Sequence, residues 1–584
     1  MQYFFDSARN KKDEEQTNLS TSVVAPAVSY ILVATFDIDV GSTLKESYPK
    51  KVDGYDSNKL AELMLPEGVH NRKEDWTYFF LNRKEFRKTC DPMSNTESIE
   101  KPVFLNCLNT VHSVHNESIK RGARVTAMAF CSRYNFVHAL KPLAILGIDA
   151  YVSNPTSGTL EKIYNTINSA IDMSSVEERD MFDRALLERF GDAKSKYSEF
   201  PLQWPAFGAV AGFEFKIQVP LYLQYNMVCP VPITPLLRIF RENVMIIFTA
   251  ILLEKRVMFV GNKDIPAGDV CGMVLAACSL LSPPFPLVPM RAFPYANLND
   301  LSFLEVCGYV AGVTNPMFAD KPDWWDILCD IQSGTVIDAE MYKNKQKPES
   351  MSKKIYTNIR GSIDKGSVAK GLLPTLRISM DSKFIARVMS GVEAHMSELW
   401  LREQFQFHCN RISDIASSKA EYFDVNAKKS ALTANRQRVM IWKTTSTYKE
   451  HHHRAIKAPG SDVGVDIRQH IRKLTTLSQM ESKDMLRAFD EILRVLKTGE
   501  DFKKFLYFLG NLDSIGICLL HNDKVIQQRA YQLLHKLKAW KFSKPAFDKM
   551  NPFLTCTFAR QKKPTGSGSS QIDLDNLEVD EVVS

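Results

Sequence analysis

The strongest apolar pattern in the chain is a run of ten uncharged residues, Val244–Leu253, which is followed at once by three charged residues, 254–256. A helix that crosses a bilayer needs about 20 mostly apolar residues, so this run is too short to span one. Apolar residues on all sides of a segment are typical of a helix buried inside a soluble domain. The next residues, Val257–Gly261, have strong strand propensity and end at a glycine. The pattern predicts a buried helix that leads into a central strand.

The N-terminal part of the chain alternates between strand-like and helix-like patterns. Runs rich in β-branched and aromatic residues predict strands at Tyr30–Phe36, Trp76–Asn82 and Arg124–Ser132. Apolar residues that recur every three or four positions predict helices in "DSNKLAELML", "NFVHALKPLAILGIDAYVS" and "TLEKIYNTINSAIDM". We therefore expect one α/β domain over residues 26–172, built on a mixed or antiparallel sheet.

A second α/β domain is predicted over residues 201–337, after a charge-dense linker at 173–200. Within it, the helix and strand of the opening run are followed by a small-residue helix, "GDVCGMVLAACSLLS", and by another strand-like run, "VCGYVAGVTNP". Strands that alternate with helices are typical of a parallel sheet covered by helices. The second domain is therefore predicted to contain a parallel sheet.

The rest of the chain is polar or helical in pattern. Residues 338–374 are polar and basic and are predicted to form a loop, whereas residues 375–561 show helical periodicity throughout. The leader at 1–25 is polar, charged and short of large aliphatic side chains after Phe5, and the tail at 562–584 is acidic and contains Gly and Ser. Both are therefore predicted to be disordered. The expected fold class is α/β plus all-α.

Composition places the chain among globular proteins, with 45% hydrophobic and 24% charged residues. Eleven cysteines occur without a C-x-x-C pair, which argues against a zinc site or a disulfide framework and favours free thiols in a reducing compartment. The N-terminus lacks a secretory pattern and the last four residues, "EVVS", lack a lipidation cysteine. We expect a cytoplasmic protein, soluble or peripheral on vesicles or the cell cortex.

The net charge of +7 is unevenly distributed, because residues 341–480 carry 25 Lys and Arg against 12 Asp and Glu. The surplus either reflects solvated helix faces and loops, or indicates weak electrostatic contact with an anionic membrane or an acidic partner. No recognisable nucleic-acid module accompanies the charge, so nucleic acid is not an expected partner.

Motifs for covalent chemistry are missing. The sequence has no phosphate-binding P-loop, no dinucleotide G-x-G-x-x-G after a strand, no H-E-x-x-H and no G-x-S-x-G. His451–His453 are interpreted as part of a solvated loop, and His112 with His115 as a weak metal signal. Asp37 and Asp39 follow a strand, where carboxylates either close a turn or bind Mg²⁺, and the turn is the favoured reading. No metal, cofactor or small-molecule substrate is expected.

Two adjacent tryptophans, Trp324 and Trp325 in "DKPDWWDILCDI", allow two interpretations. They are core and edge residues, or they form a contact surface for a partner, because tryptophan often anchors protein interfaces.

Four segments in this order resemble the DENN family: "ILVATFDIDVGSTLKESYP", "LAELMLPEGVHNRKEDWTYFFLN", "FTAILLEKRVMFVG", and "GYVAGVTNPMF" with "WWDILCDIQSGTVI". The sequence looks most similar to the fungal-type branch, whose members are described as docking proteins for an Arf-class GTPase in polarised vesicle trafficking. The resemblance spans residues 30–337 and extends more loosely to about residue 560. It implies a longin-like N-terminal domain, a central parallel-sheet domain and a helical C-terminal domain.

The resemblance also implies a function. Many relatives are guanine-nucleotide exchange factors for Rab GTPases, whereas the similar branch is described as Arf-docking, so the expected role is a regulator or docking factor for a Rab or Arf GTPase without covalent chemistry. Exchange factors act by binding the nucleotide-free GTPase more tightly than the loaded one. Glu254 and Arg256 match the charged pair ahead of the central strand, and Asn315 lies in the turn after the last strand-like run. Together with Asp37, Trp324 and Trp325, they are the candidate partner-binding residues.

Two other functions are weighed against this one. A non-catalytic adaptor would recruit trafficking or cortical proteins through the helical C-terminal region. A metabolic enzyme on the α/β region is disfavoured by the missing motifs.

Overall fold

The chain divides into two compact units, Met1–Gly464 and Val465–Ser584, which are described here separately. The computed structural model describes residues 25–37, 41–52, 54–81, 105–115, 123–177, 179, 181–192, 194–207, 211–223, 227, 230–262, 264–285, 287–345, 381–416, 425–457, 471, 474 and 481–561. Nearly all of the predicted leader, most of the basic loop and the acidic tail lie outside these residues, as does Asp39.

The first unit begins with a five-stranded sheet of order β2-β1-β5-β4-β3, in which every described pairing is antiparallel. This outcome confirms the prediction of a mixed or antiparallel sheet. Side chains alternate between its faces, since Ile31 and Val33 join one hydrophobic cluster and Leu32 and Ala34 join another. The strands are β1 (Tyr30–Asp37), β2 (Gly41–Tyr48), β3 (Glu74–Leu81), β4 (Leu105–His115) and β5 (Ala123–Ser132).

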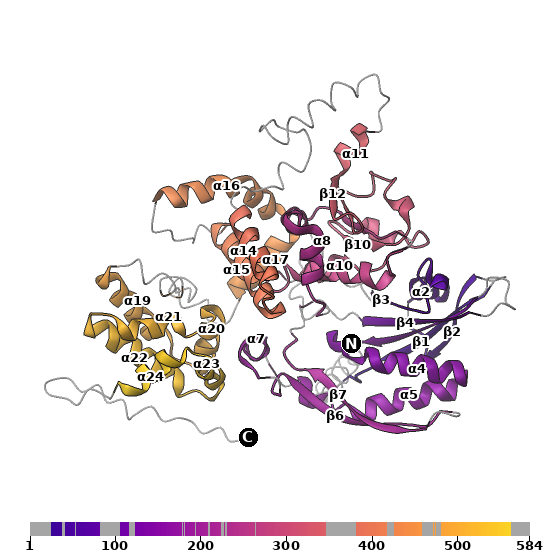
Figure 1. Ribbon diagram of the computed structural model, residues 1–584, viewed down its shortest axis with the longest axis horizontal. Helices are drawn as coiled ribbons and strands as arrows, with labels where there is room; N and C mark the ends of the chain where they lie inside the picture. Colours follow the sequence, from indigo (N-terminus) through magenta and orange to yellow (C-terminus); the bar gives the residue numbers. More distant parts are fainter. Residues whose placement is uncertain are drawn as a thin grey trace, which may run out of the picture. The chain divides into compact units, whose positions relative to one another are not determined.

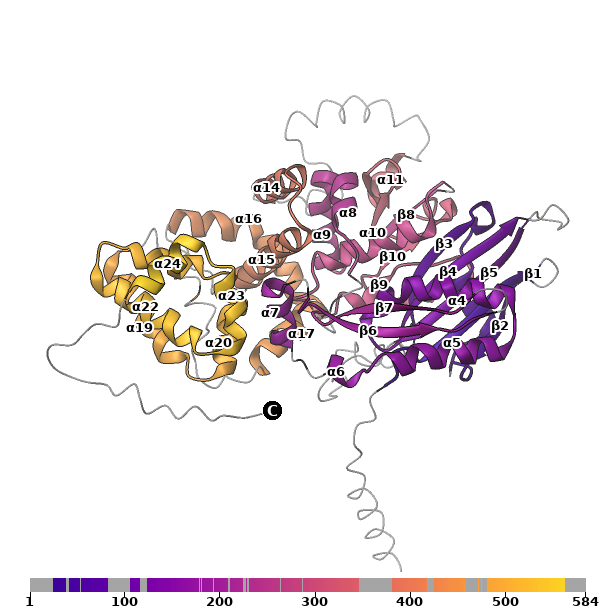
Figure 2. The ribbon, with the colours of Figure 1, turned by 60° about the horizontal axis from the view of Figure 1, so that its bottom comes forward.

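Helices cover both faces of this sheet. α2 (Ser57–Met64) packs on one face, and α4 (Lys141–Ser153) and α5 (Ser157–Ala170) lie side by side across the other (Figures 1 and 2). These are the three predicted helices. Asn135–Ser153 is long and apolar enough to cross a membrane by length and composition alone, but half of it is buried inside the protein, where α4 packs on β4 and β5.

The predicted linker at 173–200 is structured in its described part. It contains α6 (Ser174–Glu177), α7 (Met181–Phe190) and the start of a two-stranded hairpin, β6 (Tyr197–Trp204) with β7 (Phe213–Pro220). In β6, buried Phe200, Leu202 and Trp204 alternate with exposed residues, and the strand lies against α5 (Figure 1). The hairpin therefore belongs with the N-terminal layers, and the central α/β region begins later than residue 201.

The central sheet has the order β12-β11-β8-β10-β9, in which β8 (Val257–Val260) is the middle strand. β8 pairs in parallel with β10 (Val310–Val313), which confirms the predicted parallel sheet, and with β11 (Ile327–Asp330), a strand that was not predicted. The edge strand β12 pairs with β11 in the antiparallel direction. All nine residues of α9 (Val244–Leu252) are buried, so the opening run is indeed a buried helix that leads into a central strand. The remaining elements are α8 (Thr234–Phe240), η3 (Arg241–Asn243), α10 (Ala267–Ser279), β9 (Ala292–Phe293), β12 (Thr335–Asp338) and α11 (Ala339–Lys345).

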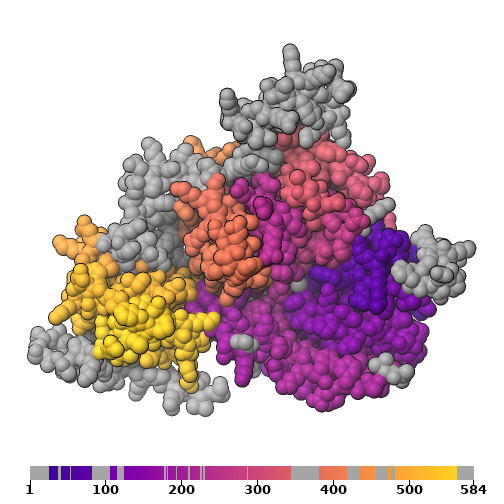
Figure 3. Space-filling model, viewed as in Figure 1, coloured from indigo at the N-terminus to yellow at the C-terminus, as the bar shows by residue number. Residues whose placement is uncertain are grey.

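One hydrophobic cluster runs through the whole first unit. It contains Ile31 of the N-terminal sheet, Phe259 of the central sheet, and Val388 and Trp442 of helices that follow both sheets. In the space-filling view the N-terminal segment, in indigo, abuts the central segment, in pink (Figure 3). The two α/β regions therefore share a core, although the pattern along the chain reads as two separate domains.

The helical region predicted at 375–561 is split between the two units. α14 (Asp381–Glu393), α15 (Glu398–Ala416), α16 (Val425–Thr444) and α17 (Ser446–Lys457) belong to the first unit. They do so because their apolar faces bury into the shared core, with Val388 and Leu401 fully buried. His451–His453 lie inside α17, so the loop interpretation of this run was wrong.

A buried ionic network joins α14, α15 and α16. The guanidinium of Arg438, 1% exposed, donates to the Asp381 carboxylate over 2.6 and 3.3 Å. The Nε2 atom of His408 lies 3.4 Å from the same carboxylate, and the His408 ring stacks on Phe384. Burial by itself raises the pKa of Asp381, but the His408 and Arg438 partners outweigh it, so the pKa is lowered overall. Asp381 is therefore held as an anion inside the protein.

Two histidines of the first unit should make its stability fall in mild acid. Burial lowers the pKa of His138 to about 4 and also lowers the pKa of His408, from an ordinary value of 6.5. Below pH 6.5 the unfolded chain therefore binds more protons than the folded one, so the free energy of unfolding decreases as the pH falls from about 7 towards 4. We expect a loss of roughly 1–2 kcal/mol by pH 5, measured by chemical denaturation across this range.

His138→Gln provides the control for this effect, because it removes one titrating ring. The variant should show a shallower loss of stability between pH 7 and 5 than the natural chain. Equal slopes for the two proteins would contradict the assignment to His138.

The second unit is an assembly of short helices. Its described helices are α19 (Ser482–Val495), α20 (Gly499–Leu509), α21 (Asp513–Gly516), η8 (Ile517–Leu520), α22 (Lys524–Lys538), η9 (Lys541–Ser543), α23 (Lys544–Asp548) and α24 (Pro552–Arg560). Thr498 and Asp501 form a capping box that satisfies backbone N–H groups at the start of α20. The core is aliphatic and aromatic, with Phe489, Phe505 and Leu533 fully buried.

Candidate interaction site

The N-terminal and central sheets are joined where β3 meets α10. The carboxylate of Asp75, 8% exposed, accepts hydrogen bonds from the backbone N–H groups of Ala267 and Gly268 over 3.0 and 3.1 Å. These are N–H groups of the first turn of α10, which have no partner within the helix. A carboxylate is also favoured there by the helix dipole. Asp75 thus caps a helix of the central region from a strand of the N-terminal sheet.

Trp76 makes the closest packing contact at this junction. A Cβ atom added at Gly268 would lie 2.1 Å from the Trp76 indole nitrogen, so only glycine allows the helix to approach the ring. The Lys141 ammonium lies 4.6 Å from the centroid of the Trp76 ring, within range of a cation–π interaction. A further contact across the junction is the hydrogen bond from the Glu67 backbone N–H to the Tyr295 hydroxyl, 3.0 Å long.

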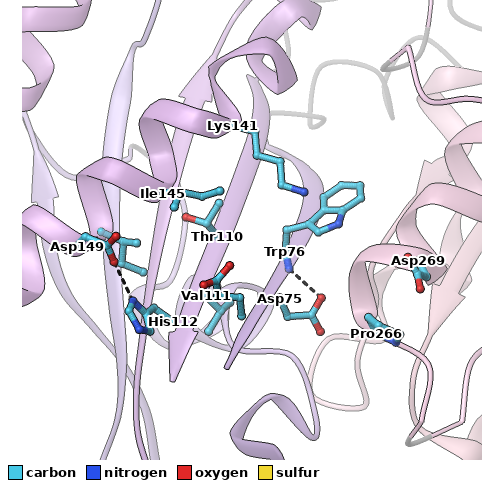
Figure 4. A pocket seen from close by; sticks show the side chains of 12 residues that line it. Asp75, Trp76, Thr110, Val111, His112, Lys141, Ile145, Asp149, Pro266 and Asp269 are labelled. Atoms are coloured by element: carbon cyan, nitrogen blue, oxygen red, sulfur yellow. Dashed lines mark hydrogen bonds and ion pairs between the residues drawn. The ribbon is translucent and has the colours of Figure 1, made fainter. Parts of the chain in front are cut away.

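A groove of about 300 Å³ opens beside this junction. Figure 4 shows Lys141 above the Trp76 ring on one side, Asp269 and Pro266 of the central region on the other, and His112 paired with Asp149 at the far end. The His112 Nδ1 atom is 2.9 Å from Asp149 Oδ1. The groove is lined by Glu74, Asp75, Trp76, Thr110, Val111, His112, Lys141, Ile145, Ile148, Asp149, Pro266 and Asp269.

The charge of the groove is mixed, with acidic groups in the majority. Burial raises the pKa of Asp269, and the nearby Asp75 carboxylate raises it further, while Arg72 and Lys141 oppose the rise. An added cation near Asp269 would relieve this repulsion. A groove with an aromatic ring, aliphatic side chains and both signs of charge is suited to binding a polypeptide surface that carries a basic residue.

Glu254 does not face this groove. It sits at the end of α9 with a positive φ of 53°, and its carboxylate accepts from the backbone N–H groups of Ser446 and Thr447 over 3.2 and 2.8 Å. The Thr447 hydroxyl donates to it as well, over 2.7 Å. Glu254 therefore caps α17 and fastens this helix to the central sheet.

Arg256 ties together the starts of two parallel strands. Its guanidinium donates to Asp326 Oδ1 over 2.8 Å and to the Asp323 carbonyl over 2.6 Å, and its backbone N–H donates to Asp326 Oδ2 over 2.8 Å. Burial alone raises the pKa of Asp326, but the hydrogen bonds from Arg256 lower it overall. Arg256 thus positions β11 beside β8.

The other predicted residues lie in two further places. Trp325 is fully buried and donates its indole N–H to the Phe318 carbonyl over 3.1 Å, so in this structure it is a core residue and offers no surface to a partner. Trp324, next to it, is partly exposed and packs edge-on against Phe318. Asn315 accepts from the Met317 backbone N–H over 2.9 Å and begins a short 3-10 helix.

The structure brings only some of the predicted residues together. Glu254, Arg256 and Trp324 lie at the edge where the parallel strands begin, whereas Asn315 follows the end of β10 at the opposite edge. Asp37 ends β1 in the other sheet, where β5 and β4 separate it from β3. The six residues therefore do not form one site.

Sequence reasoning missed the junction residues Asp75, Trp76, Lys141 and Asp269. The sequence does carry signals for two of them. Asp75 is an acidic residue at the start of a strand that is otherwise mostly apolar, and Asp269 lies in "IPAGDV", whose proline and glycine are expected where a helix begins. The pattern does not show that these two segments meet.

Taken together, the junction joins the two sheets, and the groove beside it is lined by residues of both. Comparison with known proteins finds two family models, one for a segment of each sheet region. Residues 30–122, which contain β1 to β4, match the family model described as "Docking domain of Afi1 for Arf3 in vesicle trafficking". Residues 232–340, which contain α8 to the start of α11, match the family model described as "Stabilization of polarity axis".

Two curated proteins are similar over longer stretches. An AFI1-like protein of Schizosaccharomyces pombe is 24% identical over 615 aligned positions, covering 90% of this chain and 96% of that protein. ARF3-interacting protein 1 of Saccharomyces cerevisiae is 21% identical over 474 positions, covering 56% of this chain and 51% of that protein. The first similarity extends over both units, and the second covers about half of each protein.

Proposed function

We propose that this chain is a docking protein for a small GTPase of the Arf class in vesicle trafficking and cell polarity, and that the groove between β3, α4 and α10 is part of the docking surface. One observation carries the proposal. Groove residues Glu74 to His112 fall in the segment that matches the Arf3-docking family model, and Pro266 and Asp269 fall in the segment that matches the polarity-axis model. The groove thus lies where the two matched segments meet.

The geometry supports a surface that is held rigid before the partner arrives. Asp75, Trp76 and Gly268 lock the two sheets together through buried contacts, so little ordering of the backbone is needed on binding. The groove itself is small compared with a standard interface of roughly 1,200–2,000 Å² of buried surface, so neighbouring exposed parts of both sheets must contribute as well. The groove then acts as the central pocket of a larger contact.

The proposal also covers the activity, the range of partners and the location of the protein. The DENN-like motifs suggest a further activity, acceleration of nucleotide exchange, and extend the range of partners to Rab GTPases. Such a protein would act at the cytoplasmic face of vesicles or of the cell cortex, with weak electrostatic attraction to anionic lipid. An adaptor role through the second unit is the alternative.

The test uses purified chain and a panel of Arf and Rab GTPases, each loaded with fluorescent GDP or with a non-hydrolysable GTP analogue. We expect one Arf-class member to bind with a Kd in the micromolar range or tighter, with a preference for one nucleotide state. Faster release of GDP in the same assay would add exchange activity to docking. Absence of binding by every member in every nucleotide state would refute the proposal.

A truncated chain ending at residue 464 separates docking from the adaptor role, because it retains the whole first unit. GTPase binding should survive this truncation. If the partner is lost with the second unit, the adaptor role is favoured.

A further inference from the structure

The turn that follows α22 in the second unit places an exposed tryptophan among lysines. Residues 536–544, "KLKAWKFSK", contain four lysines and no acidic residue. Trp540 is 36% exposed, and Lys538, Lys541 and Lys544 are exposed as well. The turn continues as the 3-10 helix η9, which packs against both α20 and α22.

Ring contacts join this turn to α20. The Trp540 and Phe542 rings stack with their centroids 5.8 Å apart, and the Lys503 ammonium of α20 lies 5.7 Å from the centroid of the Phe542 ring. The Trp540 ring also packs on Gly499, where an added Cβ atom would lie 2.9 Å from it, and on Phe502, whose ring centroid is 5.9 Å away. These contacts make the two rings and the Lys503 ammonium direct neighbours.

Two lysines of the turn lie on one side of η9. Residues three apart eclipse each other in a 3-10 helix, so Lys541 and Lys544 share a side. Lys541 is also the residue between the two stacked rings in the chain. We call Lys503, Trp540, Lys541, Phe542 and Lys544 the Trp540 patch.

The two acidic residues of α20 are already engaged. Glu500 Oε1 lies 2.6 Å from the Lys504 ammonium. The Asp501 carboxylate accepts from the backbone N–H groups of Lys497 and Thr498 over 3.3 and 2.9 Å. Neither carboxylate is therefore directed to the lysines of the Trp540 patch, which combines an aromatic surface with net positive charge.

An exposed tryptophan among lysines suits the surface of a bilayer that contains anionic lipid. The indole ring has an apolar body and a polar N–H group, and such rings are enriched at the headgroup level of membranes. Each lysine near an anionic surface strengthens binding by about fivefold. The lysines alone would suit an acidic protein as well, but the exposed indole among them favours the headgroup region.

We infer that the Trp540 patch binds anionic membranes, with the indole ring at the headgroup level and its lysines facing the negative headgroups. This gives the proposed attraction to anionic lipid a location, which lies outside the basic stretch at 341–480. The inference rests on the second unit alone and does not depend on the proposed docking of a GTPase.

Co-sedimentation of the full chain with vesicles tests the inference. Vesicles of three parts phosphatidylcholine to one part phosphatidylserine should bind the chain, and vesicles of phosphatidylcholine alone should not. Binding should fall as salt rises from about 0.1 M to about 1 M, because the Debye length shortens from about 10 Å to about 3 Å. Lys541→Glu combined with Lys544→Glu should weaken binding at least about 20-fold.

Lys483→Glu combined with Lys524→Glu is the matched control, because it changes the net charge by the same amount. Both lysines are exposed and lie at the starts of α19 and α22, whereas the ends of these helices lead to Gly499 and Trp540. The control should bind vesicles as the unchanged chain does. Equal losses in the two double variants would overturn the inference, as would undiminished binding of the Lys541 and Lys544 variant.

Fluorescence tests whether Trp540 itself reaches the bilayer. The chain has seven tryptophans, so Trp540→Phe, which keeps an aromatic ring on Gly499, isolates the signal of one of them. Lipids brominated in the upper part of the acyl chain should quench part of the fluorescence of the unchanged chain. That part should be missing from the variant, which still sediments with the vesicles. Equal quenching in both chains would contradict the placement of the indole ring.

Two other ligands are distinguished by the same assays. Retention of the chain on polyglutamate without binding to vesicles would assign the Trp540 patch to an acidic protein. Binding of glycerophosphoserine, the soluble headgroup, as tightly as vesicles would assign the patch to a single anion. Either result would overturn the inference.

Discussion

Replacing Asp381 by Asn should lower the free energy of unfolding of the first unit by about 3–5 kcal/mol, the largest single effect we expect on its stability. The substitution removes the negative charge that faces Arg438, whose side chain is 1% exposed. The guanidinium cannot lose its proton at neutral pH, so it would remain as an uncompensated charge inside the protein. Chemical denaturation, followed by tryptophan fluorescence, measures the loss.

The paired substitution Asp381→Leu with Arg438→Met distinguishes this cause from general loss of packing. Removing both charges should restore most of the stability, because a buried ion pair contributes little net free energy compared with apolar side chains of similar size. Glu199→Gln, which removes the partner of Lys216 in an exposed pair, should leave stability unchanged within error. A double variant as unstable as Asp381→Asn would contradict the charge explanation.

Under the proposed docking, replacing Trp76 by Ala should weaken binding of the Arf-class GTPase by about 30-fold or more, equivalent to about 2 kcal/mol. Trp76 is the large aromatic side chain of the groove, lies under the Lys141 ammonium, and is supported from behind by α10 through Gly268. Aromatic residues held in this way are the ones that contribute most to interfaces. The measurement is the Kd for the Arf-class member identified in the binding panel.

Because Trp76 also packs at the junction of the two sheets, a second variant is needed. Ile145→Arg places a long charged side chain in the groove and removes no contact between β3 and α10, so it should also weaken binding. Val152→Arg, two turns further along the same helix and 39% exposed, is the matched control. Binding that is equal in the unchanged chain and in the Ile145 variant would exclude the groove from the docking surface.

The shared core changes how a docking protein of this kind can work. Two separate domains joined by a linker could close around a partner, whereas here a continuous hydrophobic cluster and the Asp75 cap hold the two sheets in one arrangement. Under the proposed docking, the partner would meet a preformed surface, and specificity would come from side chains at the junction rather than from domain closure.

The sequence by itself determined the elements whose pattern is strong and local. Uninterrupted apolar runs specify buried elements, so they predicted the helix α9, the central strand β8 and its parallel neighbour β10. Apolar residues spaced three or four apart specify helices, so they predicted α2, α4 and α5. Among the described strands, seven were not predicted, namely β2, β4, β6, β7, β9, β11 and β12. In the case of β2, "GSTLKESY", the reason is that the strand has no apolar run and is partly exposed along its length.

Only the tertiary structure decided which of these elements share a core and where the site lies. The helices α14 to α17 belong with the sheets. Glu254 caps a helix and Arg256 joins two strands, because their partners Thr447 and Asp326 lie 193 and 70 residues further along the chain. The junction of Asp75, Trp76 and Gly268 likewise joins segments about 190 residues apart. Periodicity reports the environment of each residue but not the identity of its neighbour, and a junction made from two sheets depends on that identity.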